Sequence, residues 1–331
     1  MEQDGIAKNA RYQWLVLGTK TMIDAGFVLA AFAPLALYWI HGEQHLDKIC
    51  GLSLAFCIIP GCVLLCECGV FLYYMAPLRQ YLPDTSNPSE FVPIPMWLTL
   101  KWYWKSVLGL SLAWWVFMLT YVMHRGWASP ECSITGGSSS LSIVLGWSVV
   151  TNLLCIPGTV LGAFLVDYLG VKTSMIVGLL LQAIVGFTMG TMYSPLTNHI
   201  STFAVVYGIF LSFGEVGPGS CLRVLAVKTA LMSCVNGQIY NIAAAIGKVG
   251  AFIGMWVFPQ VIDAFGGSKT MKGIISLFWI GGGLAILNAV VTFFLVKPLT
   301  YDSMKAEDKA FHQYLEENGV DVSHMHDVFD P

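Results

Sequence analysis

Charged side chains inside apolar runs long enough to cross a bilayer are the residues of this chain that could do chemistry. Lys248 is the only charge in residues 237–259. Lys20 and Asp24 share the first apolar run, and Glu215 lies in a glycine-rich stretch of another. A charge at membrane depth is costly unless it is paired or hydrated, so each of them is a candidate functional residue.

Lys248 lies opposite a seam of small residues on its own helix. At about 100° per residue these small residues share one narrow face, where a neighbouring helix can approach closely. The seam consists of Ala243, Gly247, Gly250 and Gly254. Asn241 falls beside Lys248 on the other face. We expect both to face something polar, which is either a cavity that binds an anion or the carboxylate of a structural ion pair.

The spacing of Lys20 and Asp24 allows two roles. Four residues apart on a helix, they share a face and could neutralise each other. Alternatively, Asp24 faces a cavity and exchanges a proton, because burial favours the neutral form of a carboxyl group. Glu215 could also lie beside a cavity if the surrounding glycines and Pro218 unwind the helix inside the protein. The alternative is a plain helix end at the lipid headgroups.

Composition indicates a membrane protein. Of the 331 residues, 56% are hydrophobic and 11% are charged, whereas soluble domains carry about 25% charged residues. Eight apolar runs are long enough to span a bilayer as helices, and they lack the alternation of barrel strands. The sequence therefore predicts an all-α membrane protein with about eight transmembrane helices. These run roughly over residues 14–40, 50–74, 106–124, 141–166, 173–193, 200–220, 239–262 and 274–296.

Basic residues predict that both termini are cytosolic. An even number of spans puts the two ends on one side of the membrane. Eleven of the 17 Lys and Arg residues, including Arg223, fall on that side and four, including Arg125, fall on the other. The chain then divides into a cytosolic segment over 1–13, two spans over 14–74, a proline-rich cytosolic linker over 75–105, six spans over 106–298 and an acidic cytosolic tail over 299–331.

Other classes of function find little support. The sequence has no HExxH motif, no paired-carboxylate site and no Ser/His/Asp set at a membrane face, so we do not expect an enzyme. We expect no metal site at His324 and His326, no cofactor and no nucleic-acid partner. The spans also lack the repeated polar stripe of a channel.

A turn that follows residues 141–166 carries a recognisable motif. Gly162, Asp167, Gly170 and Lys172 have the spacing of the cytosolic loop motif of the major facilitator superfamily, which this turn resembles. A carboxylate at a helix start and a cation at the end of an opposite helix would latch two helices together on the cytosolic face.

Longer stretches resemble a narrower family, the fungal glycerophosphodiester permeases of the phosphate:proton symporter branch. The resemblance covers about residues 12–298. It implies a major facilitator-type bundle in which this chain matches helices five to twelve, so that the first four of twelve helices are missing. The stretches that carry it are Thr21–Pro34, Gly158–Asp167, Gly208–Gly219 and Gly237–Gly254.

The resemblance also implies roles for single residues. Lys248 matches a phosphate-pairing lysine, and Trp114 matches an aromatic residue that lines the substrate site. Met118 stands where the family carries an acid, which leaves Asp24 and Glu215 as the candidates for proton coupling.

Two functions remain open from the sequence. The first is proton-coupled uptake of a glycerophosphodiester or inorganic phosphate, an anionic phosphate-containing solute, by a multi-pass protein of the plasma membrane. The second is a truncated, non-transporting remnant or regulatory paralogue of such a permease.

Overall fold

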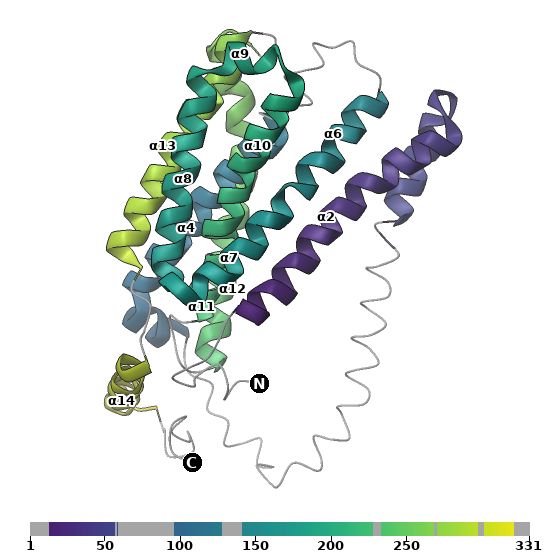
Figure 1. The fold of residues 1–331 in the computed structure, drawn as a ribbon. Coiled ribbons are helices and arrows are strands. Elements are labelled where there is room, and N and C mark those ends of the chain that lie inside the picture. The colour runs from purple at the N-terminus through teal and green to yellow at the C-terminus, as the bar shows by residue number, and fades with distance from the viewer. Residues whose placement is uncertain are drawn as a thin grey trace, which may run out of the picture.

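The structure is a computed structural model in which the described residues form helices joined by short turns (Figure 1). Seven helical segments within the described part are long and apolar enough to cross a membrane, and the first extends over Val16–His41. The eighth predicted span, residues 50–74, lies largely outside the described residues. The described residues are 13–56, 58, 96–127, 141–227, 233–267, 270–296 and 301–320.

The helices run up and down through one bundle (Figure 1). Four unbroken helices run in one direction, and two interrupted spans together with α13 return in the other. The first group is α2 (Gln13–His41), α4 (Met96–Trp127), α8 (Val171–Thr191) and α12 (Ser233–Ala264). The second group is α6 (Leu141–Leu153) with α7 (Cys155–Leu169), α10 (Ile200–Gly214) with η2 (Glu215–Gly219) and α11 (Ser220–Val227), and α13 (Met271–Leu295).

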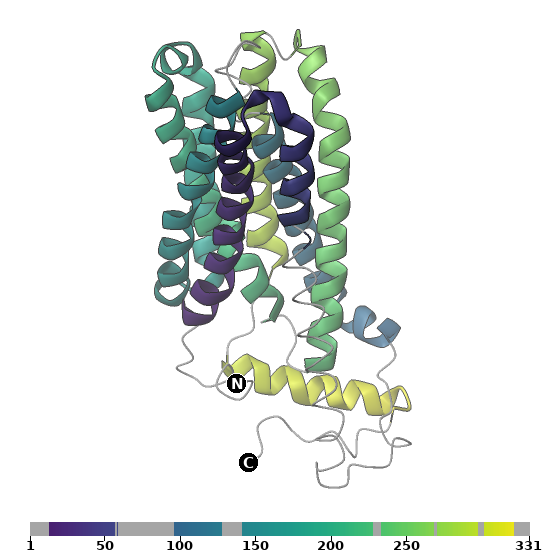
Figure 2. The ribbon, with the colours of Figure 1, turned by 90° about the vertical axis from the view of Figure 1, so that its right-hand side faces the viewer.

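Helix packing divides the bundle between a centre and an edge. Helix α4 packs against both α12 and α13, and α13 also packs against α8. Helix α2 lies at the edge of the bundle along α6 and α7 (Figures 1 and 2). The short helices η1 (Glu43–His45) and α9 (Tyr193–Thr197) lie at the end of the bundle opposite the start of α2.

Helix α4 begins at Met96, whereas the sequence predicted a span from residue 106. The extra turns are stabilised by α14 (Tyr301–Glu317), which crosses the end of the bundle where α2 begins (Figure 2). Phe311 and Tyr314 of α14 pack on the Trp102 ring at centroid distances of 6.1 and 4.8 Å. Residues 96–105 of the predicted linker are therefore helical, and residues 75–95 lie outside the described part of the chain.

The Gly/Pro-rich stretch forms a break inside a span, as one of the two interpretations predicted. Element η2 is a π-helical turn in which Gly217 departs from helical geometry with ψ −106°. Helix α11 then continues the span, so the membrane segment extends over Ser201–Ala226 instead of ending near residue 220. Close neighbours hold the turn, since a Cβ added at Gly178 would lie 2.5 Å from the Gly217 backbone.

The small-residue seam of α12 packs against α4, as its spacing predicted. Ala243 is fully buried, and a Cβ added at Gly250 would lie 2.6 Å from the carbonyl oxygen of Trp115. Close backbone approach at this seam fixes α12 beside α4. It also sets the position of the opposite face, which carries Lys248.

The packing predicts that Gly250→Ala destabilises the protein although alanine is the better helix former. Added volume against a backbone atom costs about 1–3 kcal/mol, which exceeds the helix-propensity gain of about 1 kcal/mol. Gly283→Ala is the matched control, because an added Cβ there meets nothing within 4 Å. Thermal unfolding in detergent should show a lower midpoint for Gly250→Ala only. Equal midpoints for the two variants would contradict this packing.

Candidate functional site

Lys20 joins two buried carboxylates from different helices. Its Nζ lies 2.8 Å from Asp24 Oδ1, one turn along α2, and 2.8 Å from Glu215 Oε2 of η2. Asp24 is 1% exposed and Glu215 is 3% exposed. Thr159 of α7 donates a hydrogen bond to the second oxygen of Asp24. The structure thus shows the ion pair predicted for Lys20 and Asp24, and proton exchange at Asp24 stays a prediction.

Arg125 completes this group. The sequence predicts it as a cation of the non-cytosolic side and indicates no such contact, whereas its Nη2 lies 3.8 Å from Glu215 Oε1. Its guanidinium also donates to Asn152 Oδ1 and to Cys155 Sγ, and it lies 4.9 Å from the Tyr121 ring centroid. Arg125 is in the last turn of α4, and helical side chains point toward the helix N-terminus, which here directs the guanidinium into the bundle.

We call Lys20, Asp24, Arg125 and Glu215 the charge cluster. Two cations and two carboxylates give it a formal charge of zero. Because its members and Thr159 come from α2, α4, α7 and η2, the cluster connects four elements inside the membrane.

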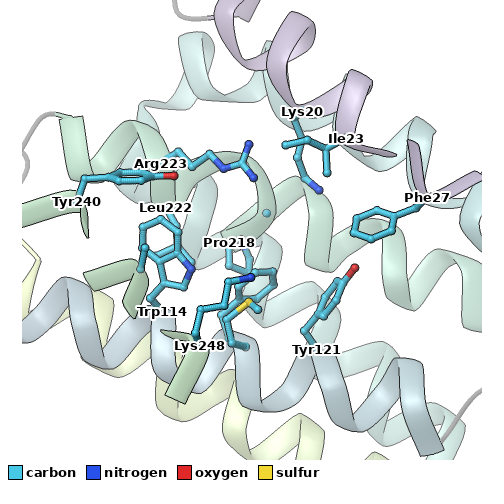
Figure 3. A pocket seen from close by; sticks show the side chains of 14 residues that line it. Lys20, Ile23, Phe27, Trp114, Tyr121, Pro218, Leu222, Arg223, Tyr240 and Lys248 are labelled. Carbon is cyan, nitrogen blue, oxygen red and sulfur yellow. The ribbon is translucent and has the colours of Figure 1, made fainter. Parts of the chain in front are cut away.

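A cavity of about 310 Å³ lies next to the charge cluster (Figure 3). It is bounded by residues of α2, α4, η2, α11 and α12. None of the lining residues in the described part of the chain is acidic. The side chains that give it its polarity and its aromatic wall are Lys20, Trp114, Tyr121, Arg223, Tyr240 and Lys248.

The structure brings some of the predicted site residues together. Lys248 and Trp114 line the same cavity, and Met118 lines it as well. Asn241 is exposed and is not among the lining residues. On α12 the cavity is lined instead by Tyr240, Ala244 and Lys248, which recur every four residues along one helix face.

Asp24 and Glu215 do not line the cavity themselves. They reach it through Lys20, whose side chain is shared between the cluster and the cavity wall. The two predicted proton-coupling residues are therefore neighbours of one cation. The sequence spacing indicated this for Asp24 and did not indicate it for Glu215.

Arg223 is a cavity residue that the sequence does not predict. The predicted span ends near residue 220, which would place Arg223 among the cytosolic cations. In the structure α11 continues the span beyond η2, so the half-buried Arg223 side chain points into the cavity (Figure 3). The signal was the helix-compatible sequence that follows Pro218 and Gly219.

In the predicted cytosolic motif, Lys172 contacts the end of another helix. Gly170 separates α7 from α8 with φ +80°, a conformation that favours glycine. Lys172 Nζ donates to the carbonyl oxygen of Phe293 at 2.8 Å, in the last turn of α13, where a cation is favourable. Gly162 packs on Val216 of η2. Asp167 is exposed at the end of α7.

Comparison with curated proteins adds independent information. The chain is 36% identical over 315 residues to the glycerophosphocholine permease GIT4 of Candida albicans, a match that covers 95% of this chain and 58% of the relative. The chain is a homologue of the fungal glycerophosphodiester permeases. The glycerophosphodiester transporter GIT2 and the major glycerophosphoinositol permease GIT3 of the same fungus are 35% and 32% identical to it over 95% and 96% of its length.

These relatives confirm the predicted resemblance and the helical, major facilitator-type fold. Inorganic phosphate transporters appear among more distant relatives. No protein-family model matches the chain. The chain spans 58% of the length of each of the three Candida relatives. Together with the seven apolar helices found in the described residues, these matches show an integral, multi-pass membrane protein whose relatives are named as transporters.

The charge cluster predicts that Glu215→Gln destabilises the protein strongly. Removing one partner of a buried ion pair costs about 3–5 kcal/mol, because the remaining charges stay buried without compensation. The control is Glu316→Gln, at an exposed position of α14. Denaturant titration in detergent should give a lower free energy of unfolding for Glu215→Gln alone. The cluster would have no such role if the two variants unfolded at the same denaturant concentration.

Proposed function

We propose that this chain forms part of a proton-coupled transporter for phosphate-containing anions, either glycerophosphodiesters or inorganic phosphate. The observation that carries the proposal is the cavity, which among the described residues is lined by cations from three helices and by no acid. The printed names of the relatives refer to glycerophosphocholine, glycerophosphodiester, glycerophosphoinositol and inorganic phosphate, and all of these share a phosphate group.

Lys248 and Trp114 divide the recognition of such a ligand between them. The Lys248 ammonium pairs with a phosphate oxygen inside the cavity. Trp114 supplies an apolar wall for the rest of the ligand, and the edge-to-face contact of its ring with Tyr240, at 5.3 Å, fixes its orientation. Binding and translocation of this kind need no chemical step, which agrees with the absence of a recognisable catalytic motif from the sequence.

The charge cluster offers a way to couple a proton to the anion. When Asp24 or Glu215 takes up a proton, the cluster changes from neutral to a charge of plus one. Lys20 then loses a partner on the cluster side while it still lines the cavity. The added positive charge raises the affinity for an anion, and by linkage the bound anion raises the affinity for the proton.

This function corresponds to a plasma-membrane protein with both termini in the cytosol. The end of the bundle that carries α14 and the start of α2 is then cytosolic, and the Lys172 latch lies near it. The end of the bundle where α9 lies would then face the outside of the cell, from which the substrate is taken up.

The first test is uptake of radiolabelled glycerophosphoinositol and phosphate by cells that express the chain. Uptake should increase as the external pH falls, and Lys248→Ala should reduce it by about tenfold or more, the size expected for the loss of a charge-assisted hydrogen bond. Lys272→Gln, at an exposed position outside the cavity, is the control. Absence of uptake at every pH would favour the non-transporting remnant, and normal uptake by Lys248→Ala would refute the role of that lysine.

The coupling scheme makes a separate prediction for Asp24→Asn. The amide mimics the protonated carboxyl, so the variant that remains folded should still bind substrate while the dependence of binding on pH becomes weaker. Binding measured between pH 5 and 8 gives the slope, and Asp263→Asn, at an exposed position of α12, should keep the slope of the unmodified protein. An unchanged slope for Asp24→Asn would exclude this carboxylate from proton coupling.

A further inference from the structure

We infer that Arg223 is a second phosphate ligand, and that together with Lys248 it favours a phosphate with two negative charges over a diester with one. The preferred ligands would then be phosphomonoesters and inorganic phosphate. This inference rests on the proposed function and specifies its substrate class. The resemblance to the permeases and the names of the relatives assign no role to Arg223.

The two side chains enter the cavity from different helices. Arg223 comes from α11, after the η2 break, and Lys248 comes from the middle of α12 (Figure 3). Trp114, Met118 and Tyr121 of α4 form another part of the wall. An anion in this cavity can therefore be held by cations from two separate elements.

The third cation of the cavity is already neutralised. Lys20 has two carboxylate oxygens at 2.8 Å, one from Asp24 and one from Glu215. Within the described part of the chain, neither Arg223 nor Lys248 has an ion pair or a hydrogen bond. The cavity thus presents two positive charges that the surrounding described residues do not balance.

Charge matching determines which phosphate suits this site. A phosphomonoester carries about −1.5 to −2 charges at neutral pH and has three terminal oxygens. A diester carries one charge and has two terminal oxygens. The planar guanidinium of Arg223 can bind two oxygens in parallel, and the ammonium of Lys248 can bind the third as a point charge. A monoester therefore uses both cations fully, and a diester leaves part of the positive charge unbalanced.

The cavity has room for such a ligand, and its described lining residues include no competing acid. Its volume of about 310 Å³ falls at the lower end of the range for small-molecule pockets, about 300–1,000 Å³. Met118 occupies the wall between the aromatic residues of α4, so that helix contributes no carboxylate to the cavity.

The experiment is titration calorimetry on the full chain in nanodiscs at pH 8. The probes are glycerol 3-phosphate as the dianion and glycerophosphoinositol as the diester with one negative charge. The unmodified protein should bind glycerol 3-phosphate more tightly. Arg223→Gln should weaken that binding by about tenfold or more, as the loss of a charge-assisted hydrogen bond predicts, and should weaken diester binding less. Lys272→Gln, which removes the same charge outside the cavity, should change neither affinity.

Binding of the diester as tightly as glycerol 3-phosphate by the unmodified protein would overturn the inference. If the protein binds the diester, and Arg223→Gln leaves both affinities unchanged, Arg223 is not a ligand and the proposed function still stands. If the protein binds neither probe, the inference and the proposed function both fail. Size-exclusion chromatography checks folding. If Arg223→Gln does not fold, Arg223→Lys replaces it. Lysine keeps the positive charge but lacks the planar guanidinium that binds two oxygens. Unchanged affinity of Arg223→Lys for glycerol 3-phosphate would therefore overturn the inference.

Discussion

The cost of placing charge inside a membrane determines how this protein is arranged. The charge cluster reduces this cost, because each of its members lies beside an opposite charge. Its members are Lys20, Asp24, Glu215 and Arg125. The group can form only if α2, α4 and η2 approach one another at the same depth. The helix packing, the break in the sixth predicted span and the position of the cavity are all consistent with that requirement.

The break at η2 connects the charge cluster to the cavity. Unwinding at Gly217 lets Glu215 face Lys20, while α11 directs Arg223 into the cavity eight residues later. The cluster neutralises Lys20, whereas Arg223 and Lys248 line the cavity without a counter-ion among the described residues. One local departure from helical geometry therefore supplies both a neutral structural centre and a positively charged cavity wall beside it.

Much of this arrangement could be predicted from the sequence, and the exceptions have physical causes. Hydropathy located the seven spans that lie in the described part of the chain, and the small-residue seam of α12 correctly gave its packing face. The roles of Arg125 and Arg223 could not be predicted, because they depend on side-chain direction and on whether the helix continues past Pro218. Its continuation is supported by close contacts from other helices, such as that of Gly178 with Gly217. Likewise, α4 starts early because α14, distant in sequence, packs on Trp102.

The central claim is that Lys20 pairs with the carboxylates of the charge cluster, whereas Arg223 and Lys248 bind the anion. Solid-state NMR can test it directly by measuring dipolar contacts between the phosphorus of bound phosphate and the side-chain nitrogens of ¹⁵N-labelled lysine and arginine. The account predicts one lysine contact that disappears in Lys248→Ala and one arginine contact that disappears in Arg223→Gln. A phosphorus contact that survives both substitutions and disappears in Lys20→Met would contradict it.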